Sequence, residues 1–113
     1  MSLLYTSDPA RGRVWRGIFA AEAPDIGFAE SADAVDAATI RYLAAWNPSP
    51  DLIARLPALE VLFSIGAGID QFDIAALPAH LDIVRMIEPG IVAGMVEYAT
   101  MAVLALHRNL IDY

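Results

Sequence analysis

Residues 59–68, Leu-Glu-Val-Leu-Phe-Ser-Ile-Gly-Ala-Gly, join an apolar run to a glycine-containing turn. Only Glu60 and Ser64 interrupt the run, which is the pattern of a central strand in a parallel sheet, buried on both faces. After the two glycines, Asp70 is expected to cap a short helix that continues to Leu77. A strand, a tight turn and a helix in this order are the repeating unit of an α/β fold.

The same alternation of apolar runs and helical segments extends in both directions from this block. Four more strands are expected at residues 3–5, 26–29, 40–46 and 81–87. Asp8-Pro9 and Ser49-Pro50 each pair an N-cap residue with proline at the first helical position, and Glu88-Pro89-Gly90 leads into a long helix over about residues 92–109. We therefore predict an α/β, flavodoxin-like parallel sheet of about five strands with flanking helices and a long final helix.

Apolar residues at helical spacing indicate which surfaces the helices bury. In the first helix we expect four such residues to cover the sheet, namely Val14, Trp15, Ile18 and Phe19. The long helix carries an apolar stripe made of Met95, Tyr98, Ala102 and Leu106, widened by Val92, Ala99 and Val103. Hydrophobic residues make up 58% of the 113-residue chain, which is high for so short a chain. We therefore expect other protein to cover part of this surface.

The composition argues against several classes of function. The net charge is −7 and the seven basic residues are all arginines scattered along the chain, which disfavours nucleic-acid binding. Cysteine is absent, so there are no disulfides or thiolate ligands, and His80 and His107 are too far apart to suggest a zinc site. No unbroken apolar run reaches the roughly 18–20 residues of a membrane span, and no cleavable leader is found. We expect a soluble, cytoplasmic protein that does not engage a membrane.

Ligands of open α/β sheets bind beyond the carboxyl ends of the strands, and residues 66–70 are the best candidate there. Gly66 and Gly68 let the backbone approach a ligand closely, and a helix start would add free N–H groups and a positive dipole end. A small anion such as a carboxylate would fit, although a simple tight turn explains the spacing equally well. Trp46 ends another strand and is either a wall of the same crevice or a core aromatic. Gln71 stands where a dinucleotide fingerprint needs its third glycine, so we expect no nicotinamide site in this chain alone.

From about Ala44 onward the chain resembles the D-isomer-specific 2-hydroxyacid dehydrogenases, most closely the glyoxylate/hydroxypyruvate reductase A group. Four segments carry the resemblance: Trp46-Asn47-Pro48, residues 59–70, Met95-Val96-Glu97-Tyr98-Ala99 and residues 107–113. The first forty residues match only in pattern, but the order of elements agrees over the whole chain.

The resemblance implies that residues 1–90 are a flavodoxin-like substrate-binding lobe and residues 91–113 an interdomain helix leading to a Rossmann cofactor domain. Enzymes of this family reduce small 2-oxo acids to D-2-hydroxy acids with NAD(P)H. By the resemblance, five residues bind substrate, namely Trp46, Gly66, Ala67, Gly68 and Ile69, and Met95 lies near the substrate and the cofactor.

The same resemblance assigns the catalytic arginine, glutamate and histidine to a part of the enzyme that would follow Tyr113. We therefore expect no catalytic residue, metal or bound cofactor in this chain, and no activity from the 113 residues alone. The parent enzyme is expected to be a homodimer.

The sequence leaves two other interpretations open. A free-standing flavodoxin-like binding module would place a flavin phosphate at the first strand–helix loop, where residues 7–12 form a poor cradle. A phospho-acceptor signalling domain would need an acidic cluster at the strand ends and a nearby lysine, and the chain has no lysine.

Overall fold

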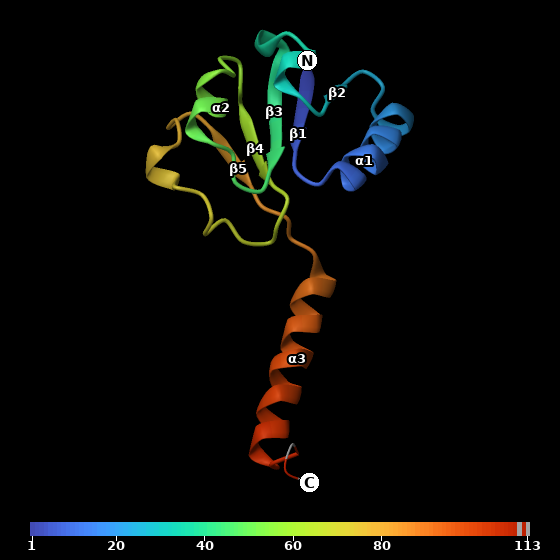
Figure 1. Ribbon diagram of the computed structural model, residues 1–113, viewed down its shortest axis with the longest axis vertical. Coiled ribbons are helices and arrows are strands. Elements are labelled where there is room, and N and C mark those ends of the chain that lie inside the picture. The colour runs from blue at the N-terminus through green and yellow to red at the C-terminus, as the bar shows by residue number, and fades with distance from the viewer. Residues whose placement is uncertain (111, 113) are drawn as a thin grey trace.

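Five strands form one parallel sheet in the order β2-β1-β3-β4-β5. They are β1 (Ser2–Thr6), β2 (Gly27–Ala29), β3 (Ile40–Ala45), β4 (Val61–Ser64) and β5 (Asp82–Val84). This order defines the flavodoxin-like arrangement, so the predicted fold class is confirmed in the computed structural model, which describes residues 1–110 and 112 (Figure 1).

The helices begin where capping residues stand in the sequence. They are α1 (Pro9–Glu22), α2 (Pro50–Ala54) and α3 (Pro89–His107), with 3₁₀ turns at Ala32–Ala34, Ala37–Thr39 and Ile74–Ala76. Asp8 Oδ2 accepts the Arg11 N–H at 2.7 Å, and Ser49 Oγ accepts the Leu52 N–H at 3.2 Å. Both predicted N-caps are therefore confirmed. The long helix begins at Pro89, slightly earlier than predicted, because the Glu88 carboxylate accepts the N–H groups that follow it.

Each face of the sheet has its own apolar cluster. Leu4, Leu43 and Leu62 are fully buried on the face that α2 and the connecting loops cover. On the other face Tyr5 packs against Trp15 of α1, with ring centroids 5.1 Å apart. Alternate residues of β1, β3 and β4 therefore serve both faces, as expected for central parallel strands.

Two predicted details are wrong. Of the four residues expected to cover the sheet, Trp15 and Phe19 do so, Ile18 is 52% exposed but lines the cavity between α1 and the sheet, and Val14, at 61% exposure, does not cover it. The reason is that buried Gly12 brings α1 closest to the sheet beside Tyr5, which makes 12, 15 and 19 the inner positions.

The helix expected from Asp70 to Leu77 is the second error, because only Ile74–Ala76 form a short 3₁₀ turn. The Phe72 N–H closes a turn on the Ile69 carbonyl at 3.0 Å, and the Phe72 side chain enters the core at 6% exposure. Burial of this ring keeps the chain along the edge of the sheet and prevents it from winding into a helix.

The long helix α3 projects away from the sheet and packs against none of the described residues of its own lobe (Figure 1). Val96, Met101 and Leu104 lie outside the predicted stripe and are also more than half exposed, so the helix is apolar on all sides. Helices of this kind are normally buried. By length and composition alone, α3 is also long and apolar enough to cross a membrane, with a mean hydropathy of 1.5. The sequence did not indicate this, because Glu97 interrupts the apolar run.

We predict that the 113-residue chain associates through α3 as its concentration rises, because apolar surface in water is covered on association. Tyr98→Glu and Leu106→Glu should shift the chain toward monomer in sedimentation velocity. Val14→Glu, at a position of similar exposure on α1, is the matched control and should leave association unchanged. Undiminished association of both α3 variants would contradict this prediction.

Candidate functional site

The pairing of β3 with β4 brings two candidate residues together at the carboxyl edge of the sheet. Ala45 lies opposite Ser64, and the Ile65 N–H donates to the Ala45 carbonyl at 3.2 Å. Trp46, which follows Ala45, and Gly66, two residues after Ser64, are neighbours at this edge. A Cβ on Gly66 would lie 2.5 Å from Cζ3 of the Trp46 indole, which covers the glycine directly.

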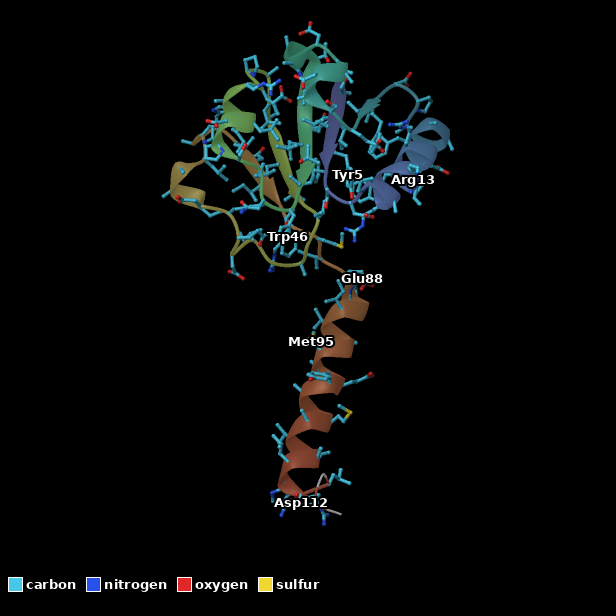
Figure 2. The ribbon with its side chains drawn as sticks, viewed as in Figure 1. Tyr5, Arg13, Trp46, Glu88, Met95 and Asp112 are labelled. Carbon is cyan, nitrogen blue, oxygen red and sulfur yellow. The ribbon has the colours of Figure 1, made fainter. Side chains whose placement is uncertain are left out.

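Trp46 is 55% exposed at the carboxyl edge of the sheet and therefore does not belong to the core (Figure 2). Of the two interpretations that the sequence left open, the core aromatic is wrong, and the role as a wall of a substrate crevice stays a prediction. The indole and the Gly-Ala-Gly loop make one surface, which no spacing in the sequence could indicate.

A buried hydroxyl organises the loop from beneath. Ser64, at 4% exposure, has its Oγ 2.9 Å from the Gly68 carbonyl oxygen and 3.1 Å from the Gly66 carbonyl oxygen. The same Oγ accepts the Gly66 N–H at 3.2 Å and an N–H from Gln71 Nε2 at 3.2 Å. Ser64 and Gln71 are site residues that sequence reasoning missed, although a polar residue within an otherwise apolar strand was a usable signal.

The loop amides divide into used and free groups. The Gly66 N–H, which we expected to face the crevice, instead donates to Ser64 Oγ. Among the described residues, the N–H groups of Ala67, Gly68 and Ile69 donate to no protein atom. Because unpaired amides need partners, these three can bind water or an anion.

The loop differs from the expected anion site in two ways. No helix begins after the loop, so no helix dipole contributes there. Neither Gly66 nor Gly68 has positive φ, and a Cβ on Gly68 would meet only Asp70 Oδ2, at 3.4 Å. The glycines therefore matter for close approach of a ligand and not for backbone strain.

Arg85 adds a positive charge at the same edge and was also missed. It follows β5, and the N–H of Met86, the next residue, donates to the Gly66 carbonyl at 3.3 Å. Three other arginines pair with carboxylates, but Arg85 forms no ion pair within the described part of the chain. Together with Ser64 it lines an apolar cavity of about 410 Å³ between α1 and the sheet.

Met95 is not brought to this site. It lies on α3 and is 59% exposed, apart from the lobe that carries Trp46 (Figure 2). Its predicted place near substrate and cofactor stays a prediction, because such a place requires protein that packs beside α3.

The first strand–helix loop does not suit a phosphate. Asp8 caps α1 with its carboxylate, and Glu30 lines the adjacent cavity together with Thr6 and Ser7. Glu30 Oε1 is buried there without a hydrogen-bond partner among the described residues. Glu30 pairs through Oε2 with Arg16, but Asp8 and Glu30 still place acceptor oxygens where a phosphate would need hydrogen-bond donors, which argues against a flavin site.

No family model matches the chain, but individual relatives do. Proteins named glyoxylate/hydroxypyruvate reductase A from Yersinia enterocolitica (serotype O:8 / biotype 1B) and from Serratia proteamaculans are each 30% identical to it over 78 residues. The match covers 64% of this chain and 25% of each relative, so the chain spans about a quarter of their length.

A solved structure extends the likeness to the fold. The crystal structure of a D-isomer specific 2-hydroxyacid dehydrogenase from Xanthobacter autotrophicus Py2, in complex with NADPH and MES, has a TM-score of 0.69 and 26% sequence identity. The match covers 92% of this chain and 35% of that chain. Since residues 89–113 make up more than a fifth of the sequence, the match must extend into α3.

Gly66→Ala should displace the Trp46 indole, because the new methyl group would overlap the ring. The half-exposed ring can turn into solvent, so the free energy of unfolding should change by less than about 1 kcal/mol. The indole N–H resonance of Trp46 should shift in ¹H–¹⁵N spectra, whereas Gly17→Ala, where a Cβ meets nothing within 4 Å, should not move it. An unmoved resonance in Gly66→Ala would mean that the ring does not rest on this glycine.

Proposed function

We propose that the chain belongs to the D-isomer-specific 2-hydroxyacid dehydrogenase family, to which these likenesses point, and that it forms the substrate-binding lobe of an NAD(P)H-dependent reductase of small 2-oxo acids. Residues 1–90 would be this lobe, and residues 91–113 an interdomain helix. The glyoxylate/hydroxypyruvate type is the activity named for both sequence relatives. The observation that carries the proposal is the Trp46 indole lying on a loop with free amides at the carboxyl edge of the sheet.

The chemistry of this edge suits the carboxylate of a 2-oxo acid. Amides of the loop Gly66-Ala67-Gly68-Ile69 supply hydrogen-bond donors, and hydrogen bonds to a charged acceptor contribute about 1.5–3 kcal/mol each. The Trp46 indole excludes water from one side of the bound acid, which strengthens those bonds. Arg85 contributes positive charge at this edge and forms no ion pair among the described residues.

The Gly-Ala-Gly loop lacks the features of a dinucleotide site. The Gly-Ala-Gly loop is followed by no helix N-terminus for a pyrophosphate, and Gln71 replaces the third glycine of the fingerprint. We therefore assign nicotinamide binding and the catalytic arginine, glutamate and histidine of the family to protein outside these residues. In this division of labour the lobe binds and orients the acid.

In the same proposal α3 is covered by a cofactor domain and, in a cytoplasmic homodimer, by a second subunit. Its apolar character on all sides supports cover by protein from more than one direction. The structural match supports cover of α3 by protein over insertion into a membrane. It extends into α3 but includes only 35% of the dehydrogenase chain, so most of that chain lies outside the match. Met95 would then face the cofactor domain.

A free-standing flavodoxin-like module is the second candidate, and only the strand order favours it. The two carboxylates at the first loop count against it. The absorbance spectrum of the purified chain separates the candidates, since a bound flavin absorbs visible light and our proposal predicts none.

The 113-residue chain should not oxidise NADPH or NADH in the presence of glyoxylate or hydroxypyruvate, because the catalytic groups lie outside it. A version that continues through the cofactor domain should do so, as followed by nicotinamide absorbance. Turnover by the rigorously purified chain would contradict this division of labour.

In the continued version, Gly68→Val should raise the KM for the 2-oxo acid, because the side chain blocks approach to the loop amides. Loss of one amide bond to the carboxylate predicts an increase of about 10-fold or more. Backbone strain should contribute little, since Gly68 lacks positive φ. Cofactor affinity should be unchanged, as in the control Gly17→Ala. Lost cofactor affinity with an unchanged substrate KM would contradict the assignment of the loop.

A further inference from the structure

The Ser64 hydroxyl uses every hydrogen-bonding capacity it has. A hydroxyl offers one donor and two acceptor lone pairs. The lone pairs take the Gly66 N–H and Gln71 Nε2, both at 3.2 Å, and the proton lies between the Gly68 and Gly66 carbonyls at 2.9 and 3.1 Å. Gln71 Nε2 also lies 3.4 Å from the Gly68 carbonyl, so this carbonyl is approached from two sides.

The direction of these carbonyls fixes the direction of the free amides. Each peptide bond is planar and trans, so a carbonyl and the N–H of the following residue point in opposite directions. The Gly68 carbonyl points to buried Ser64, and the Ile69 N–H in the same peptide therefore points away from the lobe interior. By the same geometry the Gly66 carbonyl, held by Ser64 and Met86, turns the Ala67 N–H outward.

We infer that Ser64 and Gln71 are positioning residues that aim the Ala67 and Ile69 amides at one carboxylate. This inference rests on the proposed function for the identity of the anion. Two glycines in three residues would leave the loop mobile, and no helix follows to hold it. The Ser64 and Gln71 side chains together form a clamp that orders the loop before the ligand arrives. Less conformational entropy is therefore lost when the anion binds.

The test uses the ¹⁵N-labelled 113-residue chain, titrated with sodium acetate and, as an uncharged control, with acetamide. Acetate should shift the Ala67 and Ile69 amides but not the Gly66 amide, and acetamide should shift none of them. Ser64→Ala and Gln71→Met, which remove the clamp without adding charge, should weaken acetate binding about 3- to 10-fold, equivalent to one ordinary hydrogen bond. Ser31→Ala removes a hydroxyl that caps a distant turn and should leave acetate affinity unchanged.

A second readout needs no ligand. In both clamp variants the ¹⁵N order parameters of residues 67–69 should fall, while those of the strands stay constant. Gln71 is only partly buried, so Gln71→Met carries the test if Ser64→Ala does not fold.

The outcomes separate the two claims. Acetate shifts of Ala67 and Ile69 with equal affinity and equal order in the clamp variants would overturn the positioning role and leave the proposed function standing. An unmodified chain whose loop amides do not respond to acetate would overturn both the carboxylate site and this inference.

Discussion

The parallel pairing of β3 with β4 is the constraint on which the candidate site depends. Its register places Ala45 opposite Ser64. As a result Trp46, just after β3, contacts Gly66, just after β4. A slip of one residue would turn Ser64 to the opposite face and remove the hydroxyl from beneath the loop. The apolar residues of both strands therefore determine the site as well as the core.

Anion sites in α/β proteins commonly use a helix N-terminus, but this lobe presents its amides without one. The buried Ser64 hydroxyl takes over the role of orienting the amides. It binds the Gly66 and Gly68 carbonyls on the inner side, so the N–H groups of the same peptides point outward. A serine inside an apolar strand would be costly if unpaired, and here every bond it can make is made. The same bonds that allow its burial thus orient the loop.

Local patterns predicted most of the fold and part of the site. Apolar runs located all five strands, and the proline-containing caps located α1 and α2, because both signals act within a few residues. The prediction of a helix from Asp70 was wrong, because the tertiary contacts that bury Phe72 outweighed the local capping signal. The Ser64 clamp and the contact between Trp46 and Gly66 depend on strand register, which single-residue patterns do not contain.

We propose that the Ala67 and Ile69 amides bind the carboxylate of a 2-oxo acid. The direct measurement is a crystal structure of the protein continued through the proposed cofactor domain, with NADPH and oxamate, a stable analogue of a 2-oxo acid. We expect carboxylate oxygens about 2.7–3.2 Å from the Ala67 and Ile69 nitrogens, with the Trp46 indole beside the ligand. A carboxylate bound elsewhere, with these amides facing only solvent, would contradict it.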